Sequence, residues 1–422
     1  MRDALAPVGG GPTPPAERIQ RVDILRGFAL FGVLLVNFFG SDTMSPTAEE
    51  SWIGIAINFL AEGSFYPLFS LLFGLGFAIQ LSRFEQRGES FVGTYIRRAL
   101  SLVAIGVALW VFLLGNPILM RYGSLALLLL FFKNASARTA LVASIVTFAI
   151  VLSIGPGRKA WADHQRANPV TLARLRAEAQ VTTPQAALIR KREQAAMTTG
   201  RYGEIVVVHW HSAVRLLSSP WFHLGGRNLH MFMMFLLGLF TARRGIITNS
   251  SVERPFLKWA VMLGLLIGLL GNAALLLLPR WTKDLAPFLQ RWTVDLVYYI
   301  ANPALGIGYG ASLVLLIDSS EVWKRRLEPL AWVGRMALTN FLMQFACILA
   351  LFYLQLAGVF RYMQPAVAVL LSVVLFTLQI FLSRWWLSRF SFGPAESLWR
   401  VLTFGMAATR RHTIQSPVQA MP

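Results

Sequence analysis

The sequence predicts an all-α integral membrane protein, a polytopic helical bundle of about ten transmembrane helices with both termini in the cytoplasm. Two observations lead to this fold class. Of the 422 residues, 55% are hydrophobic and only 14% are charged, and the mean hydropathy is +0.56, well outside the range of soluble domains. Apolar runs of membrane-crossing length recur along the whole chain, so we expect one membrane unit and not a soluble domain on an anchor.

The individual spans follow from these apolar runs. They are predicted near residues 24–40, 64–82, 99–115, 119–132, 139–155, 228–242, 256–278, 294–317, 331–354 and 365–388. The first run has no small-residue cleavage site after it, so we interpret it as a span and not as a signal peptide. Proline and glycine interrupt the runs at 65–77 and 302–310, where they allow either close helix packing or a cavity.

The spans form two groups of five, separated by a long basic segment. The expected regions are a disordered tail at 1–17, an N-terminal membrane region at 18–155, an extracytoplasmic loop at 156–227, a C-terminal membrane region at 228–405 and a cytoplasmic tail at 406–422. Within the loop, Thr183 as a cap and Pro184 in the first turn predict a surface helix. A solvated loop without a function is the alternative.

The charge balance has a simple membrane interpretation. The chain has 39 Lys and Arg against 20 Asp and Glu, and the basic residues gather in the connections on the side of the N-terminus, as the positive-inside rule requires. No recognisable nucleic-acid-binding fold accompanies them, so we expect membrane lipids and no nucleic acid as partners. A single cysteine, Cys347, excludes a disulfide within one chain and a cysteine metal site. The chain also has no phosphate-binding glycine loop and no nucleophile elbow.

Charged residues at the start of the first span are the first candidate site. Asp23 and Arg26 are three apart on one helix face and can form an ion pair. Arg335, near the start of the ninth span, is expected at the same membrane depth, so these residues predict a charged cytoplasmic mouth. The alternative is that Arg26 extends to the lipid headgroups while Asp23 caps the helix.

Uncharged polar residues continue along the ninth span in the motif GRMALTNFLMQ. Thr339 follows Arg335 by four residues, and Gln344 follows Asn340 by four, so both pairs lie on helix faces. They predict a polar path from the cytoplasmic side towards the outer side. Hydrogen bonding between neighbouring helices is the ordinary role of such residues and remains the alternative.

Histidines are the candidate catalytic residues, because imidazole accepts a proton near neutral pH. His209, His211 and His230 are the candidates, with His223 between them. His209 and His211 share a face in an extended backbone and diverge in a helix. Their spacing matches no compact metal motif, so no metal ligands are predicted. Packing at the membrane interface is the alternative.

Four motifs together resemble a known family. RVDILRGFALFGVLLVN, FYPLFSLLFGLGFAIQ, GRMALTNFLMQ and FGPAESLWRVLTFG are similar to the YeiB-like bacterial inner-membrane proteins, a domain of unknown function, over nearly the whole chain. That family is similar, through its first helix, to transmembrane acyltransferases, which move acetyl groups from cytoplasmic acyl-CoA to sugars. The resemblance therefore implies a location in the bacterial inner membrane.

The sequence departs from this family at two positions. The YeiB-like pattern has a histidine where Leu109 stands and an aspartate where Asn116 stands. Leucine cannot accept a proton, and an amide does not titrate in the useful range. Either this chain has lost that chemistry or another histidine has replaced it.

These observations lead to one functional hypothesis and two alternatives. The hypothesis is an acyltransferase that moves an acyl group from cytoplasmic acyl-CoA, its donor substrate, to a glycan or lipid acceptor in the envelope; no other cofactor is implied. The first alternative is a transporter or a lipid- or glycan-handling protein without covalent chemistry. The second is a structural partner in envelope assembly.

Overall fold

The computed structural model describes residues 20–167, 187–219 and 225–405, except 42, 46, 190 and 249, together with residues 171 and 222. Throughout this described part the regular structure is helical, and its one β contact is an isolated bridge between Met44 and Met363. The predicted all-α fold class is thereby confirmed. The two tails predicted at the chain ends lie outside the described residues.

The described helices occur along the chain in the order that follows. They are α1 (Gln20–Phe39), α2 (Trp52–Leu60), α3 (Phe65–Gln86), α4 (Phe91–Leu113), α5 (Ile118–Leu129) with a short 3-10 turn at Leu130–Phe132, α6 (Ala137–Ala167), α8 (Tyr202–Ser218), α10 (Gly226–Arg244), α11 (Arg254–Trp281), α12 (Pro287–Ile317), α13 (Glu321–Arg335), α14 (Ala337–Leu356), α15 (Pro365–Leu387) and α16 (Pro394–Phe404).

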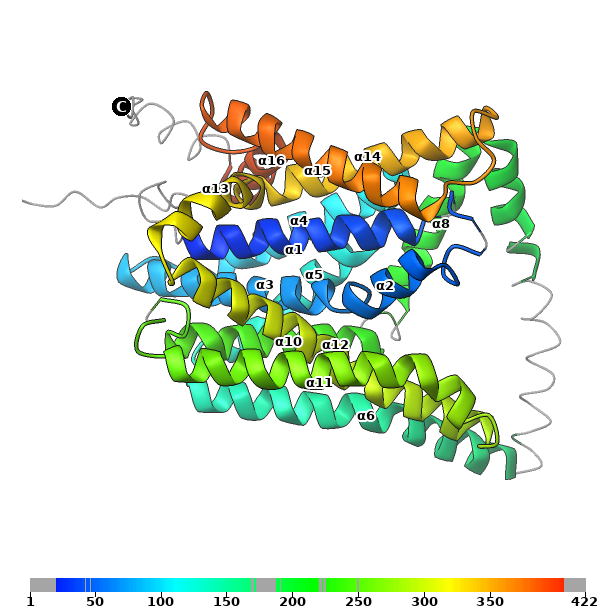
Figure 1. Ribbon diagram of the computed structural model, residues 1–422, viewed down its shortest axis with the longest axis horizontal. Helices are drawn as coiled ribbons and strands as arrows, with labels where there is room; N and C mark the ends of the chain where they lie inside the picture. Colours follow the sequence, from blue (N-terminus) through cyan, green and yellow to red (C-terminus); the bar gives the residue numbers. More distant parts are fainter. Residues whose placement is uncertain are drawn as a thin grey trace, which may run out of the picture.

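Each of the ten predicted spans is occupied by helix. Among the described residues, eight helical stretches are long and apolar enough to cross a membrane, namely α1, α2 with α3, α4, α6, α11, α12, α14 and α15. The remaining two predicted spans are α5, which is shorter, and α10, which carries arginines at both ends. In Figure 1 the long helices run side by side, with α1 among them, the α11–α12 pair below it and α6 along the lower edge of the view.

The predicted ninth span is interrupted. Helix α13 ends at Arg335, and α14 begins at Ala337 after a non-helical Met336 with φ −111° and ψ 35°. The polar sequence of α13 explains the break, because its charged residues belong at an aqueous surface and its cap, Ser320, accepts a hydrogen bond from the Trp323 N–H. Figure 1 places α13 at the end of the bundle where α1 begins.

Close backbone contact holds α13 against α1. A Cβ on Gly334 would collide with the Asp23 carbonyl oxygen, and a Cβ on Gly27 would collide with the Leu330 carbonyl oxygen. Only glycine permits such an approach, which is common where membrane helices cross. The contact brings the end of α13 to the first turns of α1.

The connection predicted at 156–227 is more helical than expected. Helix α6 continues through Pro156 to Ala167, and α8 packs against α4, where the Tyr202 hydroxyl donates to the Phe112 carbonyl at 2.9 Å. The surface helix is present at 187–189 and 191–199, whereas its predicted cap at Thr183 lies outside the described residues. Sequence reasoning did not predict α8, because its apolar run is only four residues long.

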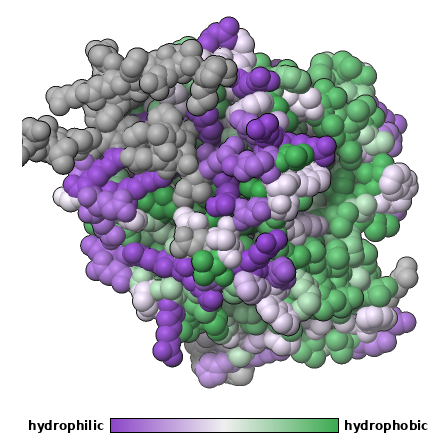
Figure 2. All heavy atoms as spheres, turned by 60° about the vertical axis from the view of Figure 1, so that its left-hand side comes forward, coloured by the Kyte–Doolittle hydropathy of each residue, from purple (hydrophilic) through white to green (hydrophobic). Residues whose placement is uncertain are grey.

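The outer surface of the bundle is strongly apolar. Leu270, Leu370 and Phe381 are 63%, 62% and 64% exposed, respectively. Figure 2 shows hydrophilic residues gathered towards the end where α1 begins and hydrophobic residues over much of the flank. A continuous apolar flank would aggregate in water, so it faces lipid in this membrane protein.

Candidate functional site

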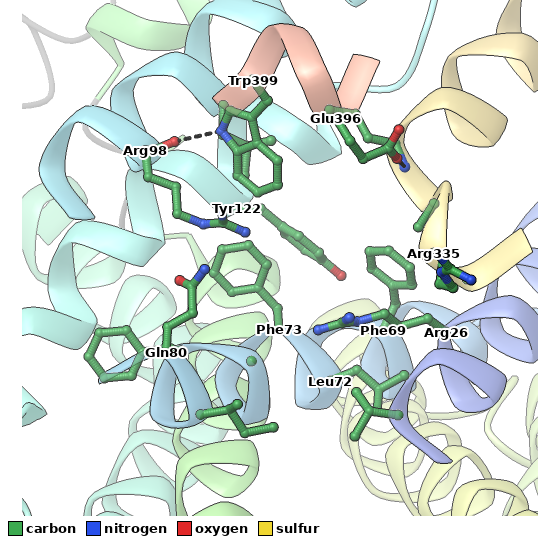
Figure 3. A pocket seen from close by; sticks show the side chains of 18 of the residues that line it. Arg26, Phe69, Leu72, Phe73, Gln80, Arg98, Tyr122, Arg335, Glu396 and Trp399 are labelled. Carbon is green, nitrogen blue, oxygen red and sulfur yellow. Dashed lines mark hydrogen bonds between the residues drawn. The ribbon is translucent and has the colours of Figure 1, made fainter. Parts of the chain in front are cut away.

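A cavity of about 330 Å³ opens among α1, α3, α4, α5, α13, α14 and α16. We call it the inner cavity, because it lies at the end of the bundle where α1 begins. Arginines are its most distinctive feature: its lining includes Arg26, Arg83, Arg87, Arg98, Arg335 and Arg400. Figure 3 shows Arg98 and Trp399 on one side and Arg26 and Arg335 on the other.

The structure brings the first predicted group together in this cavity. Asp23 is only 7% exposed, and its Oδ1 lies 3.1 Å from an Arg26 guanidinium nitrogen. Asp23 also interacts electrostatically with Arg335. The Nε of Arg335 is buried and has no hydrogen-bond partner within the described part of the chain. Asp23 is therefore shared between two arginines, while one guanidinium donor remains unused.

Glu396 is the other acidic residue that the described lining contains. Its Oε1 accepts the Leu338 N–H at 2.7 Å and the Thr339 N–H at 3.1 Å, and its Oε2 accepts the Thr339 hydroxyl at 2.5 Å. It therefore caps the first turn of α14, where backbone donors lack partners within their own helix. Burial raises the pKa of Glu396, although these hydrogen bonds oppose the shift. Both carboxylates of the inner cavity, Asp23 and Glu396, thus already have partners within the protein.

Aromatic and apolar side chains form the rest of the cavity wall. The Arg98 guanidinium lies 3.7 Å from the centre of the Trp399 ring, and the Trp399 indole N–H donates to the Arg98 carbonyl at 3.0 Å. Phe69, Phe73 and Tyr122 line the space between the two arginine groups (Figure 3). The inner cavity therefore combines cationic groups with an apolar interior.

The polar residues of α14 contact other helices. Asn340 donates to the Ser383 hydroxyl at 3.0 Å, and Gln344 donates to Gln379 at 3.3 Å. The Thr339 hydroxyl is engaged by Glu396, as described above. None of these three α14 residues is in the lining of the inner cavity, so we leave them out of the proposed site.

The three candidate histidines are not brought together. His209 and His211 lie on α8, where the helix turns them to different directions, and the His209 Nδ1 is 2.9 Å from the Ile205 carbonyl. His230 is buried in α10 beside Tyr299, with ring centres 4.9 Å apart. None of the three lines the inner cavity. The described residues also contain no cluster of His, Cys, Asp and Glu that could hold a metal ion.

Leu109 and Asn116, the two positions that differ from the YeiB-like pattern, do not line the inner cavity. Leu109 is 1% exposed and packs against Gly115. Asn116 lines a second cavity of about 310 Å³ at the other end of α1. We call this second cavity the outer cavity.

Several residues of the inner cavity were missed by sequence reasoning. Arg98 counted only as a cytoplasmic charge, and Arg400, Trp399 and Glu396 were not assigned to any helix. The signal that could have found α16 is Pro394 in the first turn followed by Glu396, a typical helix start, in a short amphipathic stretch. Its short length excluded it from a search for membrane spans.

One segment of the chain matches a known protein family. Residues 241–406 match the family described as "Protein of unknown function (DUF418)". We call this matched segment the DUF418 region. This region includes α11 to α16 and so supplies Arg335, Glu396 and Arg400 to the inner cavity, while Arg26 and Arg98 come from the part before it. The cavity is therefore built jointly by the DUF418 region and the N-terminal helices.

Relatives extend the likeness beyond the DUF418 region to nearly the whole chain. YxaH of Bacillus subtilis is 28% identical over 414 residues, which cover 93% of this chain and 96% of the relative. YeiB of Escherichia coli is 25% identical over 415 residues, covering 93% and 97%. The expected likeness to the YeiB-like family is thereby confirmed.

Proposed function

We propose that the protein is a transmembrane acyltransferase whose inner cavity binds acyl-CoA from the cytoplasm, and that it acts in the bacterial inner membrane on an acceptor in the envelope. One observation carries the proposal. Six arginines line the inner cavity against two carboxylates, and both carboxylates already have partners in the protein. Such a site favours an anionic ligand.

The chemistry of the cavity fits the two halves of an acyl-CoA molecule. Arginine presents a planar set of donors that matches phosphate oxygens, and coenzyme A carries several phosphates. The Arg335 Nε, buried and without a partner among the described residues, is one donor available to such an oxygen. The apolar interior near Phe69 and Phe73 suits the acyl chain and its linker. A cavity of about 330 Å³ is within the usual range of ligand sites.

The proposed reaction is the transfer of an acyl group from sulfur to oxygen. The thioester C–S bond breaks, a C–O bond forms to an acceptor hydroxyl, and the hydroxyl proton ends on the released thiol. The proposal gives His209, His211 and His230 no part in donor binding, because they do not line the inner cavity. The similarity of this chain to bacterial proteins supports a bacterial membrane as the location.

Calorimetry of acetyl-CoA binding to the purified protein tests the proposal. We expect the wild type to bind, and Arg26→Ala and Arg335→Ala each to weaken binding about tenfold or more, because a hydrogen bond to a charged group contributes roughly 1.5–3 kcal/mol. Arg326→Ala is the matched control, since Arg326 is exposed on the same helix as Arg335 and lies over Trp323. No binding to the wild type, or equal weakening in the control, would contradict the proposal.

A transporter without covalent chemistry is the second candidate. The observation that favours it is that Tyr66 lines both the inner and the outer cavity, so the same side chain separates the two cavities within the bundle. An experiment in reconstituted vesicles distinguishes the two candidates. Acetyl-CoA carries one label in its acetyl group and another in its phosphates, and the appearance of each label on the far side of the membrane is measured. A transporter moves both labels across together, whereas a transferase delivers only the acetyl label to the far side.

A further inference from the structure

The outer cavity lies at the opposite end of α1 from the inner cavity. Its walls come from the end of α1 and the residues just after it, the connection between α4 and α5, and the second half of α14. Met197 also contributes to the wall. At a rise of about 1.5 Å per residue, Asn37 in the outer cavity is about 20 Å along α1 from Asp23 in the inner cavity. The two sites are therefore stacked along the same helices.

One side of the outer cavity is polar. The Tyr66 hydroxyl donates to the Asn37 side-chain oxygen at 2.6 Å, and Asn116 interacts with the same hydroxyl. The hydroxyls of Ser41 and Thr43 lie next to them, 2.7 Å from each other. Two amides and three hydroxyls thus line the same small space.

The Asn37 amide has an unused hydrogen-bonding group. Its Nδ2 is buried and has no partner among the described residues. If the amide were turned over, Nδ2 would face Tyr66 and the oxygen would become the unused atom, so one end lacks a partner in either orientation. Buried polar atoms are nearly always hydrogen-bonded, and leaving one unpaired is costly. The amide is therefore ready to bind a polar atom that enters the cavity.

The opposite side of the outer cavity is apolar. Phe345, Ile348, Leu349 and Phe352 form it from α14. No described residue of the lining is charged, in contrast to the six arginines of the inner cavity. Transfer of a charged group into such a site would be expensive, because no opposite charge compensates the loss of hydration. The lining therefore selects an uncharged ligand with a polar part and an apolar part.

We propose that the outer cavity is a second binding site, which takes an uncharged amphipathic ligand that presents hydroxyl groups to Asn37, Asn116 and Tyr66 and an apolar part to α14. Binding at this site does not depend on the function proposed above. The role of the ligand as the acyl acceptor does rest on that function, since an acceptor must offer a hydroxyl near the inner cavity.

Protection of an introduced thiol from labelling tests this site. In a Cys347→Ala background, Ser41→Cys places a thiol in the outer cavity, and Ser45→Cys, outside the lining, is the matched control. The protein is held in lipid nanodiscs and labelled with a water-soluble maleimide. The probe is octyl glucoside below its micelle concentration, with octyl sulfate as the charged probe of equal tail length.

We expect octyl glucoside to slow labelling of the Ser41→Cys thiol severalfold and to leave the Ser45→Cys thiol unaffected, with octyl sulfate giving little protection. Adding Asn37→Leu or Asn116→Leu should weaken the protection about tenfold, because the amide donors and acceptors are lost. Two replacements are used so that one misfolded variant, recognised by its elution from a sizing column, does not decide the test.

Three results would overturn the proposal: no protection by octyl glucoside, equal protection by octyl sulfate, or protection that survives both replacements in folded protein. Acetyl-CoA calorimetry on the same samples separates the two proposals. Protection without acetyl-CoA binding would support the outer site and reject the donor site. Acetyl-CoA binding without protection would support the donor site and reject the outer site.

Discussion

The Thr339 hydroxyl donates to Glu396 Oε2 at 2.5 Å and accepts the Ala395 N–H at 3.1 Å. Glu396 in turn accepts the backbone N–H groups of Leu338 and Thr339. The starts of α14 and α16 are therefore bound to each other through one threonine and one glutamate. Because both helices line the inner cavity, this pair fixes the position of one of its walls.

Replacement of Thr339 by valine should destabilise the protein. Thr339→Val keeps the shape of the side chain but leaves Glu396 Oε2 and the Ala395 N–H without their partner, which costs about 1–3 kcal/mol. The measurement is the thermal unfolding midpoint in detergent. Thr377→Val is the control, because the Thr377 hydroxyl is exposed on α15 and bonds only to its own helix. Equal midpoints for the two variants would contradict the structural role of Thr339.

The stability of the protein should depend on pH through Glu396. Burial raises the pKa of Glu396 above its ordinary value of 4.5, so between these two pKa values the folded protein binds more protons than the unfolded chain. Stability is therefore greatest below pH 4.5 with respect to this group, and it falls as pH rises through the raised pKa. Unfolding midpoints measured across this range should lose that component in Glu396→Gln. A Glu396→Gln profile identical to the wild type would show that another group is responsible.

The contact between α1 and α13 should not tolerate a side chain at Gly334. A Cβ at this position collides with backbone atoms of Asp23, which cannot move without shifting α1. Gly334→Ala is expected to lower the free energy of unfolding by about 1–3 kcal/mol, as extra atoms in a well-packed core do. It should also weaken acetyl-CoA binding, because Arg335 is displaced.

Gly93→Ala provides the comparison for Gly334→Ala. A Cβ on Gly93 meets nothing within 4 Å, and alanine is a better helix former than glycine by about 0.5–1 kcal/mol. This variant should therefore be slightly more stable than the wild type in the same unfolding measurement. Destabilisation at Gly93, or tolerance at Gly334, would disagree with the packing of the two helices.

Binding of acetyl-CoA should weaken with salt. The arginines of the inner cavity attract phosphate groups electrostatically, and dissolved ions screen this attraction where the cavity is open. The dissociation constant from calorimetry should rise severalfold between about 0.05 M and about 0.5 M sodium chloride. Pantetheine, which lacks the phosphates, should show little change. A salt-independent constant for acetyl-CoA would indicate that apolar contacts dominate.

Sequence reasoning predicted the helical spans well because hydrophobic length is a local property. It failed at α13 and α14, where Arg335 and Met336 separate a polar helix from an apolar one, since one apolar window covered the end of the first and nearly all of the second. It also missed α16, which is too short to cross a bilayer. These boundaries depend on capping and on contacts between distant segments.

The candidate site was predicted only in part. Asp23, Arg26 and Arg335 were expected at one depth, because charge is costly within a membrane, and they do line one cavity. The roles of Asn340 and Glu396 depend on which neighbour each side chain meets, here Ser383 and Thr339. Periodicity gives the helix face of a residue but does not identify the partner helix.

The position of Tyr66 between the two cavities has an electrical consequence. If water fills the two cavities from opposite ends, it carries the potential of each solution into the bundle, and the low-dielectric barrier narrows to the layer around this side chain. Most of the voltage across the membrane then falls over that layer. A unit charge that crossed it would exchange about 2.3 kcal/mol with the field for every 100 mV. An uncharged group that passes Tyr66 would move without this electrical work, whatever the sign of the membrane potential.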